Sequence, residues 1–229
     1  MHRTSRVLVG VIALVLSAVL AACATGSPSP GAAPSPAGSG GTSSDGAAQG
    51  TVVLVIRHGE KPDGSDPGVD AGGKKDNSSL TAVGWQRAEA LADLFDPTSG
   101  PLRPGLARPT AIYASGADDD GEGKRPRETV APLAQRLGIT VNTDYGKGDE
   151  QALVKNATGR PGPVLICWQH GELPDIAAAF PGVTPTPPAD WPGDRFDVIW
   201  TFTRTADGWL FAQLPELVLP QDQNTVIDG

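Results

Sequence analysis

Basic residues are scarce in this chain, and long hydrophobic runs are absent. The 18 lysines and arginines stand against 26 aspartates and glutamates, which gives a net charge of −8. Proteins that bind nucleic acid need a basic face, so this balance argues against a nucleic-acid partner. The most extended apolar stretch, residues 7–20, is shorter than the roughly 20 residues of a membrane-spanning helix. We therefore expect neither a nucleic-acid-binding protein nor a transmembrane helix.

The N-terminal segment has the parts of a secretory signal peptide. Arg3 and Arg6 make a basic start, residues 7–20 are apolar, and small residues precede Cys23. The sequence Leu-Ala-Ala-Cys that ends at Cys23 resembles the lipobox of bacterial lipoproteins, in which the cysteine becomes the lipid-modified first residue. The resemblance implies a signal peptide at 1–22, a lipid anchor at Cys23, and a location on the extracytoplasmic side of the cell membrane.

The next segment, residues 23–50, consists mainly of Thr, Gly, Ser, Pro and Ala. It has almost nothing to bury and cannot offset the entropy lost on ordering, so we expect a disordered tether. Residues 51–229 then form one domain of about 180 residues, which is long enough for a full core. With Cys23 assigned to lipid, Cys167 has no partner for a disulfide. Its apolar neighbours predict a small buried side chain.

Strand and helix patterns alternate along residues 51–229. Residues 51–56 form a continuous apolar run, which is typical of a strand covered on both faces. Thr81 precedes apolar residues at helical spacing, which predicts a capped helix that Pro97 ends. The same reasoning predicts strands at 110–114, 139–141 and 164–170, helices at 127–137, 149–157 and 171–180, a loop at 181–193, and a two-stranded hairpin around 205–208. This alternation predicts an α/β fold, a three-layer sandwich with a largely parallel central sheet flanked by helices.

Two strand ends carry the ionisable residues that indicate a site. Of the three histidines in the chain, His58 and His170 lie in the domain, and each directly follows an apolar strand. Arg57 precedes His58. Ligands of open α/β sheets bind at the carboxyl ends of the strands. If these two strands are neighbours, both imidazoles point into one crevice.

The pattern resembles the histidine phosphatase superfamily, the phosphoglycerate mutase-like proteins. Four segments match in the right order, and His170 matches the second histidine of the family. The segments are RHG at 57–59, LTAVGWQRAEALA at 80–92, YAS at 113–115 and RPRET at 125–129. The resemblance implies a phosphoglycerate mutase-like fold without a cofactor and makes Arg125 the second core arginine. Arg127 stays open as an alternative, because the gap before this segment is unusually long.

The chemistry of the residues agrees with these roles. Arginine forks bind phosphoryl oxygens bidentately, which suits Arg57 and Arg125. Histidine can act as a nucleophile that splits phosphoryl transfer into two steps, so we expect a phosphohistidine at His58. His170 and the arginines would stabilise charge on the transferring group. We therefore predict a hydrolase of small phosphomonoesters that needs no metal.

The leaving group needs a proton donor, and the sequence offers several. Glu150, Glu172 and the acidic loop at 118–122 are the candidates. Two other interpretations stay open. One is a zinc hydrolase that uses His58, His170 and a carboxylate. The other is a binding protein of the same fold, which captures a phosphorylated ligand without turnover.

Overall fold

The computed structural model describes residues 50–116 and 123–229. The predicted signal peptide, Cys23, the tether except Gly50, and the acidic loop at 118–122 lie outside these residues. In the described part of the chain, no helix is both long and apolar enough to cross a membrane.

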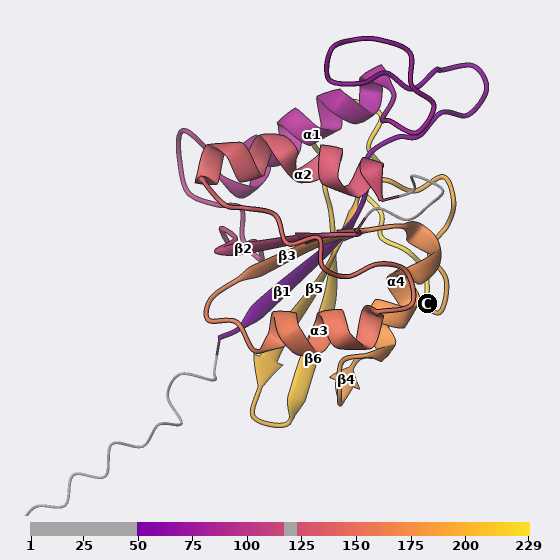
Figure 1. Cartoon of the computed structure of the whole chain (residues 1–229). Helices are drawn as coiled ribbons and strands as arrows, with labels where there is room; N and C mark the ends of the chain where they lie inside the picture. The colour runs from indigo at the N-terminus through magenta and orange to yellow at the C-terminus, as the bar shows by residue number, and fades with distance from the viewer. Residues whose placement is uncertain (1–49, 117–122) are drawn as a thin grey trace, which may run out of the picture. The chain divides into compact units, whose positions relative to one another are not determined.

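Six strands form one sheet in the order β2-β3-β1-β5-β6-β4 (Figure 1). Their bounds are β1 (Val52–Arg57), β2 (Ala111–Ala114), β3 (Val164–Trp168), β4 (Val183–Thr184), β5 (Val198–Thr205) and β6 (Gly208–Pro215). β1 pairs in parallel with β3, as do β2 with β3 and β4 with β6. β5 is antiparallel to both β1 and β6. Among these six strands only β5 runs against the common direction, so the prediction of a largely parallel sheet is confirmed.

Helices cover both faces of this sheet, which gives the predicted three layers (Figure 1). They are α1 (Ala82–Phe95), α2 (Lys124–Leu137), α3 (Glu150–Thr158) and α4 (Leu173–Ala178). Side chains of β1 alternate between the two layers, as the pleat of a strand requires. Leu54 and Ile56 pack in the cluster under α1 and α2, whereas Val53 and Val55 pack in the cluster under α3 and α4. A strand covered on both faces explains the continuous apolar run in the sequence.

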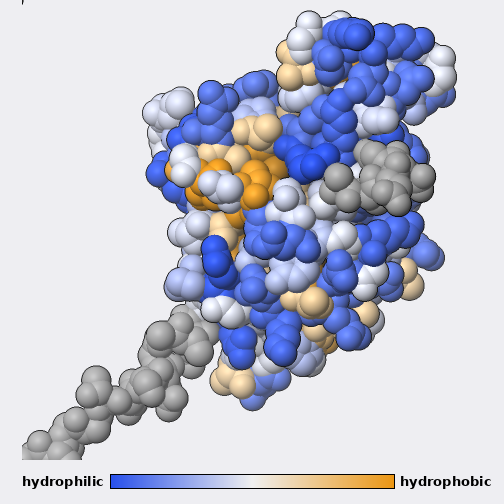
Figure 2. All heavy atoms as spheres, in the orientation of Figure 1, coloured by the Kyte–Doolittle hydropathy of each residue, from blue (hydrophilic) through white to orange (hydrophobic). Residues whose placement is uncertain are grey.

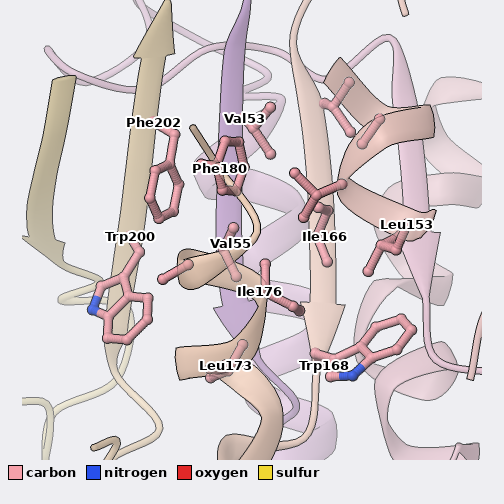
Figure 3. Close-up of a cluster of buried hydrophobic side chains, with 14 of the residues drawn as sticks. Val53, Val55, Leu153, Ile166, Trp168, Leu173, Ile176, Phe180, Trp200 and Phe202 are labelled. Carbon is pink, nitrogen blue, oxygen red and sulfur yellow. The ribbon is translucent and has the colours of Figure 1, made fainter. Parts of the chain in front are cut away.

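The core under α3 and α4 is rich in aromatic side chains. Phe180 stacks on Phe202 with 4.1 Å between ring centroids. Figure 3 shows Val55, Ile166 and Trp200, from β1, β3 and β5, on the side of the sheet that α4 covers. This packing holds β3 and β5 on either side of β1. The ends of β1 and β3 therefore emerge at the same edge of the sheet.

The start of α1, the end of α2 and the turn of the hairpin agree with the local sequence signals. Thr81 caps α1, and its hydroxyl oxygen accepts a hydrogen bond from the N–H of Gly84 (3.1 Å). α2 ends at Gly138 with a left-handed φ of 65°, a conformation that glycine adopts without strain. α2 begins at Lys124, ahead of the predicted position 127. The hairpin of β5 and β6 turns at residues 205–208, as predicted.

The strand predicted at 139–141 is wrong. This segment meets the sheet through one isolated bridge, between Asn142 and Tyr113 of β2. Ile139 and Val141 instead pack, partly buried, against the cluster under α1 and α2. Figure 2 shows a hydrophobic area over α2 on an otherwise mainly hydrophilic face. The predicted loop at 181–193 also contains the two-residue strand β4.

Candidate active site

His58 and His170 line one pocket because β1 and β3 are parallel neighbours. The strands pair in register up to Arg57 opposite Trp168, and the backbone N–H of His58 donates to the carbonyl of Trp168 (3.0 Å). The pocket has a volume of about 180 Å³. Its lining residues are His58, Lys61, Arg125, Lys147, Gln169, His170, Gly171 and Glu172. The structure therefore brings both histidines together with one of the two candidate arginines.

His58 is held as a neutral, oriented imidazole. Its Nδ1 lies 2.7 Å from the carbonyl oxygen of Gly59. A carbonyl can only accept, so Nδ1 carries the proton and Nε2 keeps a lone pair. Burial lowers the pKa of His58 to about 3, against the opposing effect of the hydrogen bond to Gly59 and with help from Arg57 and Arg125. The imidazole is therefore uncharged at neutral pH, the state that a nucleophile needs.

Gly59 joins three elements behind this imidazole. Its N–H donates to Oγ1 of Thr129 (2.8 Å), and this hydroxyl donates to the carbonyl of Arg125 (2.8 Å). These bonds tie the end of β1 to the first turns of α2. α1 also passes close to Gly59, because a Cβ on residue 59 would lie 2.9 Å from the carbonyl oxygen of Gly84 in α1. The position therefore requires glycine, and Thr129 explains a further residue of the RPRET segment.

Arg57 is fully buried and only partly hydrogen-bonded. Its guanidinium stacks on the ring of Phe196, with 3.7 Å from the guanidinium carbon to the ring centroid. Nη1 donates to three backbone carbonyls, those of Pro192 (3.3 Å), Gly193 (2.8 Å) and Arg195 (2.8 Å). Nε and Nη2 are buried and have no hydrogen-bond partner among the described residues. Burial lowers the pKa of Arg57 to about 10, so this unpaired edge is charged at neutral pH.

Arg125 is the better placed of the two arginines that the sequence leaves open. Its side chain lines the pocket, and Arg127 does not. Nη2 of Arg125 makes a long hydrogen bond of 3.4 Å to the carbonyl of Asn77. Its Nε is buried without a partner in the described part of the chain. Arg125 thus brings into the pocket an N–H that can still donate a hydrogen bond. Arg57 is not among the lining residues, but its charge lowers the pKa of both His58 and His170, which places its unpaired edge close to them.

His170 occupies the more open side of the pocket. It starts a short 3-10 turn, His170–Glu172, directly after β3. Burial, followed by the charges of Arg57 and Lys61, lowers its pKa, while Glu172 acts in the opposite direction. A neutral ring at this position can donate a hydrogen bond to a ligand oxygen without adding charge.

The candidate proton donors occupy different places. Glu172 lines the pocket, and its Oε1 forms an ion pair of 2.6 Å with Nζ of Lys147. Glu150 does not line the pocket; it lies in the first turn of α3 and accepts the N–H of Gly148 (3.1 Å). The candidates at 118–122 lie outside the described residues.

Sequence reasoning missed several residues of the pocket. Lys61, Lys147 and Gln169 line it, and the segment around Phe196 contacts Arg57. Lys61 directly follows the RHGE sequence, so its position close to the end of β1 could have indicated that it lies near His58. Phe196 had no such signal, because it comes from a segment about 140 positions farther along the chain, which only the fold brings to β1.

Arg87 is the centre of a buried cluster of ion pairs, and Glu60 is one of its members. Arg87 of α1 pairs with Glu60 (2.8 Å), Glu216 (2.6 Å) and Asp222 (2.7 Å). Glu216 is completely buried, and burial raises its pKa to about 8 although Arg87 opposes this shift. The side chain of Glu60 is therefore committed to Arg87 rather than to the pocket.

A metal centre would need more ligands than the two histidines. Across residues 50–116 and 123–229, no group of three or more His, Cys, Asp and Glu side chains is arranged to hold a metal ion.

Cys167 lies fully buried in β3, as predicted, and burial raises the pKa of its thiol.

No family model and no curated protein matches this sequence. Solved structures with a similar arrangement include the protein histidine phosphatase SixA complexed with tungstate, at 15% identity and a TM-score of 0.46 over 72% of this chain and 97% of that one. A mycobacterial glucosyl-3-phosphoglycerate phosphatase complexed with VO3 has 13% identity and a TM-score of 0.44 over 72% and 98%. A phosphoglycerate mutase from Bacillus anthracis has 9% identity and a TM-score of 0.43 over 74% and 93%. At such low similarity, activity must be argued from the pocket itself.

Proposed function

We propose that this protein is a phosphomonoester hydrolase of the histidine phosphatase type, which works through a phosphohistidine on His58. One observation carries the proposal. A neutral imidazole with a free Nε2 shares a pocket with Arg125 and directly follows Arg57 in the chain, and both arginines have buried N–H groups without a partner among the described residues. A phosphoryl group supplies both the electrophile that the imidazole needs and the anionic oxygens that the arginines need.

Binding of the substrate follows from the charges of the pocket. Nε and Nη2 of Arg57 and Nε of Arg125 are buried without a hydrogen-bond partner among the described residues. Buried donors without partners are costly, so hydrogen bonds to phosphoryl oxygens remove an existing penalty. Lys61 adds positive charge at the rim, and a neutral His170 adds one donor. This set favours a small phosphorylated substrate.

Hydrolysis then takes two steps. Nε2 of His58 attacks phosphorus, the bond from phosphorus to the leaving oxygen breaks, and the leaving alcohol takes up a proton. Of the candidate acids, Glu172 is the one that lines the pocket. In the second step water attacks the phosphohistidine and returns a proton to the group that protonated the alcohol, the N–P bond breaks, and inorganic phosphate leaves with the imidazole neutral again. The arginines hold the transferring group in both steps.

The proposed location rests on the N-terminal sequence. A basic start, an apolar segment and the Leu-Ala-Ala-Cys sequence support a signal peptide at 1–22 and lipid attachment at Cys23. The tether would then hold the catalytic domain on the extracytoplasmic side of the cell membrane. The substrate would be a phosphomonoester that is present there.

Trapping the intermediate tests the proposed function. The protein is mixed with a 32P-labelled phosphomonoester and the reaction is quenched rapidly without acid. Label should then be found on His58, and it should be labile to acid and stable to base. His58→Ala should abolish both label and turnover. His170→Ala should slow turnover severely, with label still directed to His58. Acid-resistant label, or an active His58→Ala protein, contradicts the mechanism. Stoichiometric ligand binding without product release indicates a binding protein.

A further inference from the structure

Arg57, which directly precedes the pocket residue His58, is held by a segment far from it in the sequence. Three carbonyls, from Pro192, Gly193 and Arg195, surround Nη1 of Arg57, and Phe196 covers the face of its guanidinium. Nη1 is occupied, whereas Nε and Nη2 are buried without a hydrogen-bond partner among the described residues. This segment therefore decides which edge of the guanidinium is left without a partner.

The carbonyl of Arg195 is the best supported of the three. It also accepts the indole N–H of Trp191 (2.9 Å). The Arg195 side chain donates through Nε to Oδ1 of Asp197 (2.7 Å) and through Nη2 to the carbonyl of Thr225 (2.7 Å). Arg195 itself is only 8% exposed. It therefore has little freedom to move relative to β5, which begins just after Asp197.

The C-terminal segment completes this support. The second oxygen of Asp197 accepts the N–H of Gln223 (2.6 Å). Farther on, the backbone N–H and carbonyl of Ile227 both bond to the side chain of Gln213 in β6. The chain after residue 222 is thereby attached to the sheet. Arg195 links this attached segment to the guanidinium of Arg57.

We propose that Arg195 is a positioning residue, which acts through its own carbonyl to orient Arg57 so that phosphoryl oxygens bind side-on to Nε and Nη2. The proposal rests on the proposed function, because it concerns how the same pocket binds phosphate. Arg195 does not line the pocket. Its side chain bonds to Asp197 and Thr225 rather than to substrate.

Binding of inorganic phosphate, measured by calorimetry on the purified full chain, tests this role. Arg195→Ala should weaken phosphate binding about tenfold, which is within the range of couplings between contacting residues. The phosphate affinity of Arg195→Lys should lie between those of wild type and Arg195→Ala, because an ammonium keeps the charge next to Asp197 but cannot bond to both acceptors. Arg204→Ala is the matched control. It removes a β5 arginine that lies over Trp209, outside the pocket, and should leave binding unchanged.

A double-mutant cycle separates positioning from general damage to the fold. In an Arg57→Lys background there is no guanidinium to orient, so Arg195→Ala should change phosphate affinity less than about twofold. An unchanged affinity in the Arg195→Ala protein, or an equal loss in both backgrounds, overturns the inference. If Arg195→Ala does not fold, the same comparison with Arg195→Lys decides it. A wild-type protein that binds no phosphate overturns the proposed function instead.

Discussion

The buried neutral state of His58 should make the protein less stable in acid. In the unfolded chain the imidazole takes up a proton near its ordinary pKa of 6.5, whereas in the folded chain its pKa is about 3. Between these values the unfolded state binds a proton that the folded state does not. The free energy of unfolding contributed by His58 therefore falls as the pH falls from 6.5 towards 3.

The size of this effect follows from the separation of the two pKa values. Each pH unit below the unfolded pKa costs about 1.4 kcal/mol. Near pH 4.5, about two units below it, the loss should be on the order of 3 kcal/mol. Other groups titrate in the same range, so the wild-type curve alone is not diagnostic. The difference between wild type and a variant that lacks only this titration isolates the contribution of His58.

His58→Asn provides this comparison. Its amide can still donate to the carbonyl of Gly59 but does not titrate. Urea unfolding, followed by tryptophan fluorescence near pH 7 and pH 4.5, should show wild type losing about 3 kcal/mol more than the variant between the two conditions. Wild-type and variant free energies that run parallel with pH would refute the buried neutral imidazole, and with it the activated nucleophile.

Four further outcomes are expected. Arg125→Ala should raise the KM for phosphomonoesters about tenfold or more, as expected for a charged hydrogen bond, whereas steady-state assays of Arg127→Ala should show little change. Wild type should lose stability as the pH rises from 4.5 to about 8, because in this range Glu216 keeps a proton in the folded state that the unfolded state releases, and Glu216→Gln should remove this loss. Urea unfolding of both proteins near pH 6 and pH 9 measures the difference. A variant whose stability falls with pH as steeply as that of wild type counts against the buried acid. Cys23→Ala should abolish labelling by a fatty-acid analogue and release the protein from the membrane fraction, and a variant that stays membrane-bound contradicts the lipobox. Activity should survive dialysis against a chelator, whereas loss with recovery on added zinc would favour a zinc hydrolase.

The proton donor shows where sequence reasoning about the site ended. Glu150 and Glu172 are equivalent as sequence, since each is a carboxylate at the start of a helical segment. The fold places Glu172 in the pocket and directs Glu150 to the backbone of Gly148. Which carboxylate reaches the substrate depends on how α3 and the turn after β3 pack on the sheet. Neither residue's neighbours in the chain contain this information.

The predicted strand at 139–141 failed for a related reason. Alternating apolar residues indicate that one side of a segment will be buried, but not whether the segment pairs as a strand of the sheet or packs against helices. In the structure Ile139 and Val141 pack on the cluster under α1 and α2, and only Asn142 pairs with β2. The predictions for β1 and α1 succeeded because the decisive signals, a long apolar run and the Thr81 cap, act over a few neighbouring residues.

The sequence by itself determined the alternation of strands and helices and the placement of Arg57, His58 and His170 at strand ends, because hydrophobic periodicity and caps are local. Only the tertiary structure decided how these side chains are used. The order β3-β1-β5 brings His170 to one side of His58 and the segment before β5 to the other. That segment takes up Nη1 of Arg57 and leaves Nε and Nη2 without a partner among the described residues. Such contacts join residues about 110 to 140 positions apart, and they exist only after the sheet has assembled.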